Sequence, residues 1–325
     1  AALPIATADV AQEGSWDEVP SYWHDAADWL NEHSEGGRTL VVPASTFSTY
    51  QWGLLTDEPL QSLSDGPWAV RDIIPFGGVR SARLMDGFEE AFESGRVPDG
   101  LAEAMSRAGV SQVVVRNDLD LTRTAATRPA FVSRVLDAAP GFERVAGFGP
   151  EVTPDVTRER VTWDLGTAPA LQALEVFEVE PTPERATTYD LPSSLAVLGS
   201  TEAVQQLADQ GVLGDRGTLL AADDPELAEQ AGRWVITDDL RRRDLAFGLI
   251  QDADSYTLLP DERSPDTNGE PVDRLLPGDE DSLSHVEYLD PVRDVRASSY
   301  YRGFAREPGM QPAAAFDGDP STAWH

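Results

Sequence analysis

The strongest constraint on the fold is the segment 110–116, VSQVVVR, because its three successive valines leave no polar face. A strand that is apolar on both sides fits the interior of a sheet whose two faces are both covered by helices. Around this strand, helical and strand patterns alternate through residues 1–150. We therefore expect an α/β fold with a mixed or mostly parallel sheet and flanking helices.

Apolar spacing, together with Pro and Gly at segment ends, predicts the other elements of this part. A helix starts at Pro20, and Gly36 marks its end. The strand after it is a short run that Pro43 closes. The segment 171–180, LQALEVFEVE, alternates with period two and predicts a half-exposed strand. The remaining predicted elements are helices at 81–94, 101–108 and 129–138 and a strand at 142–148.

A second, smaller unit follows with its own strand and helix patterns. Its predicted strands are 195–198, 218–221 and 234–237, with helices at 201–210 and 225–231. The segment 252–290 then has twelve acidic residues against two Arg, which is typical of a solvated linker. We therefore divide the chain into an α/β domain (1–180), a βαβ unit (181–251), an acidic linker (252–290) and the start of a further domain (291–325).

The charge and the missing residue types exclude several classes of function. The net charge is −32, and all 25 basic residues are Arg. Nucleic-acid binding relies on clustered basic residues, so we expect no nucleic-acid partner. The acidity fits either general solubility or adaptation to high salt. The chain has no Cys, which excludes disulfides and Cys-type zinc sites.

Neither end of the chain has the features of a natural terminus. Ala1 is not an initiator Met, and no basic region followed by an apolar core comes after it. We therefore expect the sequence to be a piece of a longer protein. No apolar run approaches the ~20 residues that cross a bilayer, so we expect this piece to be soluble.

Tryptophan is concentrated near the beginning of the chain. Trp23 and Trp29 have the spacing of a helix core. By contrast, Trp16, Trp52 and Trp68 lie among Gly, Pro and polar residues, where a surface that stacks on sugars or faces a membrane is an alternative to core packing.

Polar residues near the expected strand ends complete a candidate substrate-binding surface. The loop after Pro43 and the loop after Arg116 should meet, because parallel strands bring their carboxyl ends to one edge of a sheet. The full candidate set is Trp16, Trp52, Trp68, Arg71, Asp72, Asn117 and Asp118.

Several long strings carry a resemblance to a known family. They are GSWDEVPSYWHDAADWL, TLVVPASTFSTYQWG, DEPLQSLSDGPWAVRDIIPFGG and VVVRNDLD, in this order. The chain resembles the extracytoplasmic part of the actinobacterial α-(1→3)-arabinofuranosyltransferases, glycosyltransferases of the GT-C type that build cell-wall arabinan. The resemblance implies a parent anchored by membrane helices that lie outside this segment. Those helices would carry the active site and take arabinofuranose from a polyprenyl-phosphate donor. No catalytic residue is then expected in this chain.

The last segment carries a second resemblance. VRASSYYRG and AAAFDGDPSTAWH are similar to the start of discoidin-like domains, which are galactose-binding-like jelly rolls. This implies that 291–325 forms the first strands of a truncated carbohydrate-binding β-sandwich. In that family a matching loop holds a structural calcium, and the corresponding residues are Asp317, Asp319 and Thr322. An acidic turn without metal is the alternative, and no other cofactor is expected.

These observations lead to one main hypothesis and two alternatives. The main hypothesis is that the chain lies on the periplasmic side of the plasma membrane. There it positions an arabinan or arabinogalactan acceptor for the membrane-embedded active site. The first alternative is a non-catalytic structural spacer that displays a carbohydrate-binding module at the cell surface. The second is an autonomous α/β hydrolase or sugar-processing enzyme.

Overall fold

The fold is seen in a computed structural model, which describes residues 14–33, 36–45, 47–55, 57–72, 79–93, 97–121, 123–124, 126–152, 170–184, 186–199, 201–221, 223–237, 245–247 and 250–252. The predicted acidic linker beyond Asp252 and the predicted start of a β-sandwich at 291–325 lie outside these residues.

A five-stranded mixed sheet forms the centre of the first unit, with the strand order β4-β1-β5-β7-β6. Strand β1 runs parallel to both β4 and β5, whereas β7 is antiparallel to both β5 and β6. The carboxyl ends of β4, β1 and β5 therefore share one edge. The strands are β1 (Arg38–Ser45), β4 (Trp68–Asp72), β5 (Val110–Arg116), β6 (Phe142–Val152) and β7 (Leu171–Val179).

Helices cover both faces of this sheet, as the apolar strand β5 requires. Val113 and Val115 belong to one hydrophobic cluster, and Val114 between them belongs to the other. Each fully buried valine stabilises the fold by roughly 1.5–3 kcal/mol. Helices α4 (Val79–Glu93), α5 (Leu101–Arg107) and α6 (Pro129–Ala138) contribute to the first cluster, and α2 (Ser21–His33) and α3 (Leu60–Leu63) contribute to the second.

The second unit contains a three-stranded parallel sheet with the order β10-β8-β9. Leu195 and Leu207 of this unit join the same hydrophobic cluster as Phe88 and Leu101 of the first unit. The two units therefore share a core across the predicted boundary after residue 180. The elements are η1 (Leu191–Ser193), β8 (Leu195–Leu198), α7 (Ala203–Asp209), β9 (Thr218–Leu220), α8 (Pro225–Ala228) and β10 (Arg233–Ile236).

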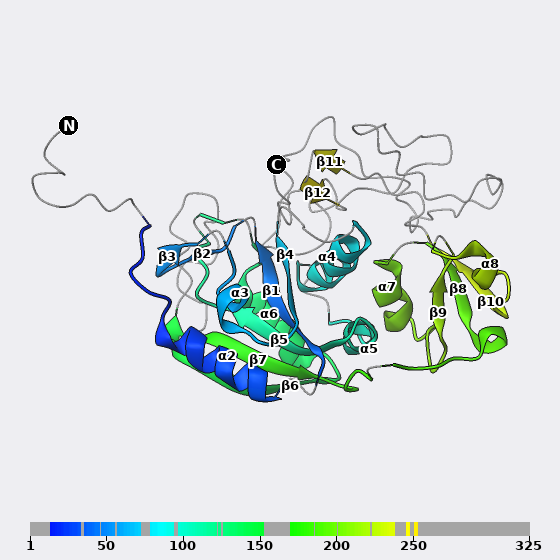
Figure 1. Ribbon diagram of the computed structural model, residues 1–325, viewed down its shortest axis with the longest axis horizontal. Coiled ribbons are helices and arrows are strands. Elements are labelled where there is room, and N and C mark those ends of the chain that lie inside the picture. Colours follow the sequence, from blue (N-terminus) through cyan, green and yellow to red (C-terminus); the bar gives the residue numbers. More distant parts are fainter. Residues whose placement is uncertain are drawn as a thin grey trace, which may run out of the picture.

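Two short hairpins complete the described structure. The β2–β3 hairpin, β2 (Thr49–Tyr50) and β3 (Gly53–Leu54), follows β1 directly, and β11 (Leu245–Phe247) pairs with β12 (Ile250–Asp252). Figure 1 shows the β2–β3 hairpin at the end of the molecule opposite the β8–β10 sheet, with α2 lying along β6 and β7. The hairpin therefore lies far from the second unit.

The structure confirms most predicted elements and corrects the bounds or the burial of others; β6, for example, continues to Val152, beyond its predicted end at 148. Strand β5, helix α6 and strand β8 have the predicted bounds. Strand β1 does not stop at Pro43 but continues to Ser45. The predicted half-exposure of β7 is wrong, because this strand lies between β5 and β6 and its residues 173–177 are all buried.

Candidate functional site

The loops that follow β1 and β5 meet at the carboxyl edge of the sheet, as the sequence predicts. The backbone N–H of Gln51 donates to the carbonyl of Asp118 at 2.8 Å, and that of Asp120 donates to the carbonyl of Thr49 at 2.9 Å. Tyr50 and Leu119 form an isolated antiparallel bridge. The β2–β3 hairpin is therefore fixed to the loop after β5 by main-chain hydrogen bonds.

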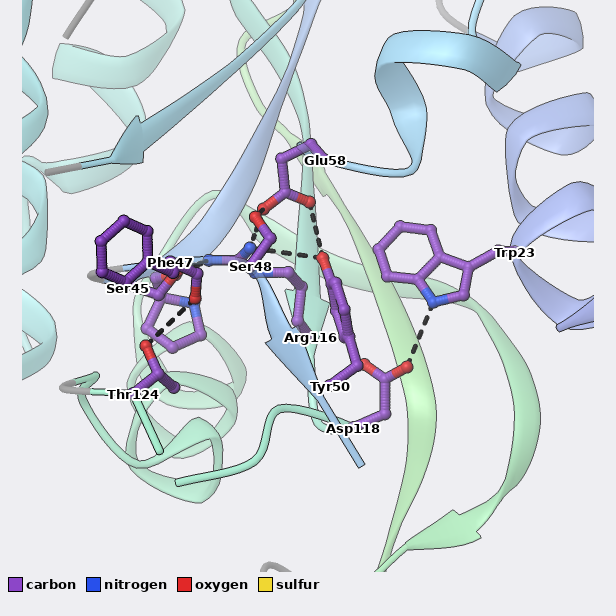
Figure 2. Close-up of polar contacts among 10 residues, drawn as sticks. Trp23, Ser45, Phe47, Ser48, Tyr50, Glu58, Arg116, Asp118 and Thr124 are labelled. Atoms are coloured by element: carbon purple, nitrogen blue, oxygen red, sulfur yellow. Dashed lines mark hydrogen bonds and ion pairs between the residues drawn. The ribbon is translucent and has the colours of Figure 1, made fainter. Parts of the chain in front are cut away.

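Asp118 is the polar centre of this junction. Its carboxylate is buried, and its Oδ2 accepts hydrogen bonds from the Tyr22 hydroxyl at 2.8 Å, the Trp23 indole at 3.1 Å and the Trp52 indole at 3.0 Å. Figure 2 shows the Trp23 indole pointing at this carboxylate. One carboxylate oxygen thus joins helix α2 to the β2–β3 hairpin.

The buried position of Asp118 raises the pKa of its own carboxyl group and that of the neighbouring Tyr22 hydroxyl. Burial raises the pKa of Asp118 to about 6, and the hydrogen bonds from Tyr22, Trp52 and Trp23 oppose this rise without cancelling it. Burial and the Asp118 charge raise the pKa of the Tyr22 hydroxyl well above its ordinary value. The phenol therefore stays a hydrogen-bond donor at neutral pH.

Aromatic rings surround the carboxylate. The Trp52 ring stacks on Tyr50 with centroids 5.0 Å apart and planes 14° apart. Trp16 lies perpendicular to Trp52 at 6.0 Å, and Trp23 lies edge-on to Tyr50 at 5.5 Å. We call these four residues, together with Tyr22, the aromatic cluster. Trp23 and Tyr50 are buried, Trp52 is half-buried, and Trp16 is 39% exposed.

A second buried network lies beside the first and is shown in Figure 2. Arg116 forms an ion pair with Glu58, whose carboxylate also accepts from the Tyr50 hydroxyl at 2.6 Å and from Ser48 at 2.7 Å. Burial works against the charge of Arg116, but Glu58 and Tyr50 outweigh it and raise the pKa of the guanidinium. Glu58 therefore neutralises the charge of Arg116. Because Tyr50 of β2 donates to the same Glu58, the ion pair also ties the β2–β3 hairpin to β5.

Asn117 lies apart from Asp118 although the two are adjacent in sequence. Its side chain donates to the carbonyl of Gln172 at 2.8 Å and to Glu175 at 3.0 Å, and Glu175 also accepts from Ser133 of α6 at 2.7 Å. Because side chains alternate along an extended chain, Asn117 faces the side of Val113 and Val115. The structure thus separates Asn117 from the aromatic cluster.

The candidate residues on β4 do not join the aromatic cluster either. Trp68 is not in a loop but begins β4, where it pairs with Thr39 near the amino end of β1. Arg71 is buried and forms a 2.6 Å ion pair with Asp86 of α4. Asp72 ends β4 beside Ser45. Of the seven candidates, the structure therefore brings together Trp16, Trp52 and Asp118.

Comparison with known proteins identifies the family. Residues 1–271 match the family described as "Alpha-(1->3)-arabinofuranosyltransferase, N-terminal GT-C domain". This chain belongs to that family. The chain is similar to the alpha-(1->3)-arabinofuranosyltransferases of Mycolicibacterium smegmatis, at 36% identity, and of Mycobacterium tuberculosis, at 34%. Each match covers 98% of this chain and 23% of the relative, so this chain spans less than a quarter of the relatives' length.

Solved structures of an arabinofuranosyltransferase share the fold. A single-particle cryo-EM structure of arabinofuranosyltransferase AftD from mycobacteria matches with a TM-score of 0.64 at 35% identity, covering 76% of this chain and 19% of that chain. A mutant form of the same protein matches with a TM-score of 0.66 at 34% identity, covering 83% of this chain and 22% of that chain.

Sequence reasoning misses three members of the site: Tyr22, Trp23 and Tyr50. The sequence predicts Trp23 in the core of its helix, and Trp23 is buried there, but its indole also donates to Asp118. The alternation of side chains along β5 is a signal that could find them. Continued past the end of the strand, this alternation places Asp118 on the same face as Val114, which is the face that α2 covers.

The described residues contain no group of three or more His, Cys, Asp or Glu that could hold a metal ion. None of their helices has the length and apolar character needed to span a membrane. Asp317, Asp319 and Thr322 lie outside the described part of the chain, so calcium binding there stays a prediction.

Proposed function

We propose that this chain positions an arabinan acceptor for an arabinofuranosyltransferase whose active site lies in another part of the same protein. The parent would use a polyprenyl-phosphate arabinose donor and would be anchored by membrane helices elsewhere in its sequence. This segment would lie on the extracytoplasmic side of the membrane. Holding the acceptor in the right orientation accelerates transfer without any proton chemistry in this segment.

The proposal rests on the hydrogen bond between the Trp52 indole and the Asp118 carboxylate. Trp52 offers a half-buried aromatic ring, and its Nε1 is fixed by a 3.0 Å hydrogen bond to a buried carboxylate. Apolar and aromatic surface with a few fixed polar groups is typical of sites that bind small molecules and sugars. The matched family is described as an arabinofuranosyltransferase, and an arabinofuranose unit is therefore the ligand we propose for this pair.

The charges around the pair favour the acceptor over the donor. The three side-chain donors to Asp118 Oδ2, two indoles and a phenol, are all neutral. The nearby Arg116 is already paired with Glu58. A polyprenyl phosphate would bring its negative charge next to the Asp118 carboxylate, whereas a neutral pentose polymer would not.

Steady-state kinetics of the full-length protein tests this role. Trp52→Phe keeps an aromatic ring but removes the indole donor and part of the stacking surface. If the chain holds the acceptor, this change should raise the KM for the acceptor several-fold and leave kcat at saturating acceptor nearly unchanged. The alternative function, a structural spacer, predicts no change in either constant.

A further inference from the structure

The segment 14–20, which we call the strap, crosses the β2–β3 hairpin. It contains neither helix nor strand, and residues 15–18 are exposed. The carbonyl of Gly14 accepts from the backbone N–H of Leu54 at 2.8 Å, which ties one end of the strap to β3. Segments with few buried apolar contacts and exposed backbone open at low free energy. We therefore expect the strap to open more easily than the hydrogen-bonded β2–β3 hairpin.

Trp16 is the strap residue that reaches Trp52. Their rings are perpendicular with centroids 6.0 Å apart, and the strap packs so closely that a Cβ added at Gly53 would lie 2.6 Å from the Cβ of Trp16. Tyr50 already stacks on Trp52. In this arrangement Tyr50 and Trp16 contact the ring surface of Trp52 on which a sugar ring could otherwise stack.

Asp118, which holds the Trp52 indole, has an unmet hydrogen-bonding requirement. All three of its side-chain donors use Oδ2, and within the described residues the buried Oδ1 has no hydrogen-bond partner. A buried acceptor without a donor destabilises a structure unless another group supplies the hydrogen bond. A hydroxyl group is the neutral donor that suits a carboxylate oxygen, and every pentose unit carries several.

We propose that the strap is a gate over a saccharide subsite, and that Trp16 takes up the position on Trp52 that a pentofuranose ring occupies when the acceptor binds. Displacement of the strap frees the Trp52 ring for stacking and lets a sugar hydroxyl donate to Asp118 Oδ1. The ligand class is a neutral furanose oligosaccharide. This inference rests on the proposed function and goes beyond it, because it makes Trp16 an obstacle to binding and not a binding residue.

A gate of this kind lowers the apparent affinity by the fraction of molecules that are open. An edge-on aromatic pair contributes a modest stabilisation, so its removal should strengthen saccharide binding roughly 2- to 10-fold. The direction of this change separates the gate from ordinary stacking. A Trp16 that stacks on the sugar would instead give weaker binding when it is removed.

Two substitutions open the gate in different ways. Trp16→Ala removes the obstructing ring. Gly53→Ala keeps the Trp16 side chain. The added methyl group would lie 2.6 Å from the Cβ of Trp16, so the strap must shift. Gly66→Ala is the matched control, because a Cβ there would have its nearest neighbour at 3.8 Å. All three variants are made in the whole chain and titrated calorimetrically with a neutral arabinofuranose oligosaccharide.

The gate predicts tighter binding for Trp16→Ala and Gly53→Ala, with Gly66→Ala equal to wild type. If the wild type binds and the two opening variants bind equally well or more weakly, the gate is wrong and the proposed acceptor-binding function stands. If neither the wild type nor the opening variants bind while their thermal unfolding shows intact folds, both the gate and the proposed function fail.

Discussion

The indole Nε1 of Trp52 donates a hydrogen bond of 3.0 Å to Oδ2 of Asp118, which lies 66 residues further along the chain. The same oxygen accepts from Tyr22 and Trp23 of helix α2. One buried carboxylate therefore joins the β2–β3 hairpin to helix α2, in addition to the main-chain hydrogen bonds that hold the hairpin. Changes at Asp118 should consequently affect both stability and ligand binding.

Asp118→Asn should change how stability depends on pH. Burial raises the pKa of Asp118 from 3.8 to about 6, so the folded chain holds this proton more tightly than the unfolded chain does. The group therefore favours folding below about pH 4, and this contribution is lost as the pH rises to about 6. The free energy of unfolding of the wild type, relative to Asp118→Asn, should fall by roughly 2 kcal/mol between pH 4 and pH 7.

Urea unfolding at pH 4, 5, 6 and 7 measures this difference, and other titrating groups cancel when the two proteins are compared. Asp57→Asn is the control, because Asp57 is exposed. A difference between wild type and Asp118→Asn that stays constant over this range would contradict the raised pKa of the carboxyl.

Glu58→Gln should strongly destabilise the fold. Arg116 and Glu58 are both buried and paired, and the substitution leaves the guanidinium charge without its partner. The expected loss is about 3–5 kcal/mol of unfolding free energy, measured by chemical denaturation. Glu103→Gln, which weakens a partly exposed i,i+4 pair with Arg107, should cost less than about 1 kcal/mol. Equal losses for the two variants would show that burial does not set the strength of the pair.

Trp23→Ala should lower the melting temperature far more than Trp234→Ala. Trp23 is completely buried in the cluster between α2 and the sheet, whereas Trp234 on β10 is 45% exposed. Removing a buried Trp costs about 3–5 kcal/mol, because it loses apolar contacts and leaves a cavity. Differential scanning calorimetry of both variants makes the comparison, and a larger effect at Trp234 would place the core elsewhere.

Local patterns predicted the sheet better than they predicted the site. Three successive valines make β5 apolar on both faces, so the sequence alone predicts that strand and its helical cover. The sequence places Asn117 and Asp118 in one candidate site because both follow Arg116 at the carboxyl edge of the sheet, yet the alternation of an extended chain sends their side chains to opposite faces. The contact of Tyr22 with Asp118 depends on how α2 packs against the sheet, which no local pattern encodes.

The isolated chain should show no arabinosyl transfer. The proposed function assigns the chemistry to segments that this chain, at 23% of the length of its relatives, does not contain. Incubation of the purified chain with a polyprenyl-phosphate arabinose donor and an arabinan acceptor should give product at the level of the protein-free blank. Turnover above that blank would mean that the described residues include a catalytic site.

Calorimetric titration of the whole chain with a neutral arabinofuranose oligosaccharide tests the acceptor-binding role most directly. Trp52→Phe and Trp234→Phe are compared with wild type, because Trp52 lies against Asp118 and the exposed Trp234 lies on strand β10 of the second unit. We predict measurable binding by wild type and Trp234→Phe, and at least several-fold weaker binding by Trp52→Phe with its fold intact. Equal affinities of all three proteins, or no binding by the wild type, would contradict the role of the Trp52 and Asp118 pair in holding the acceptor.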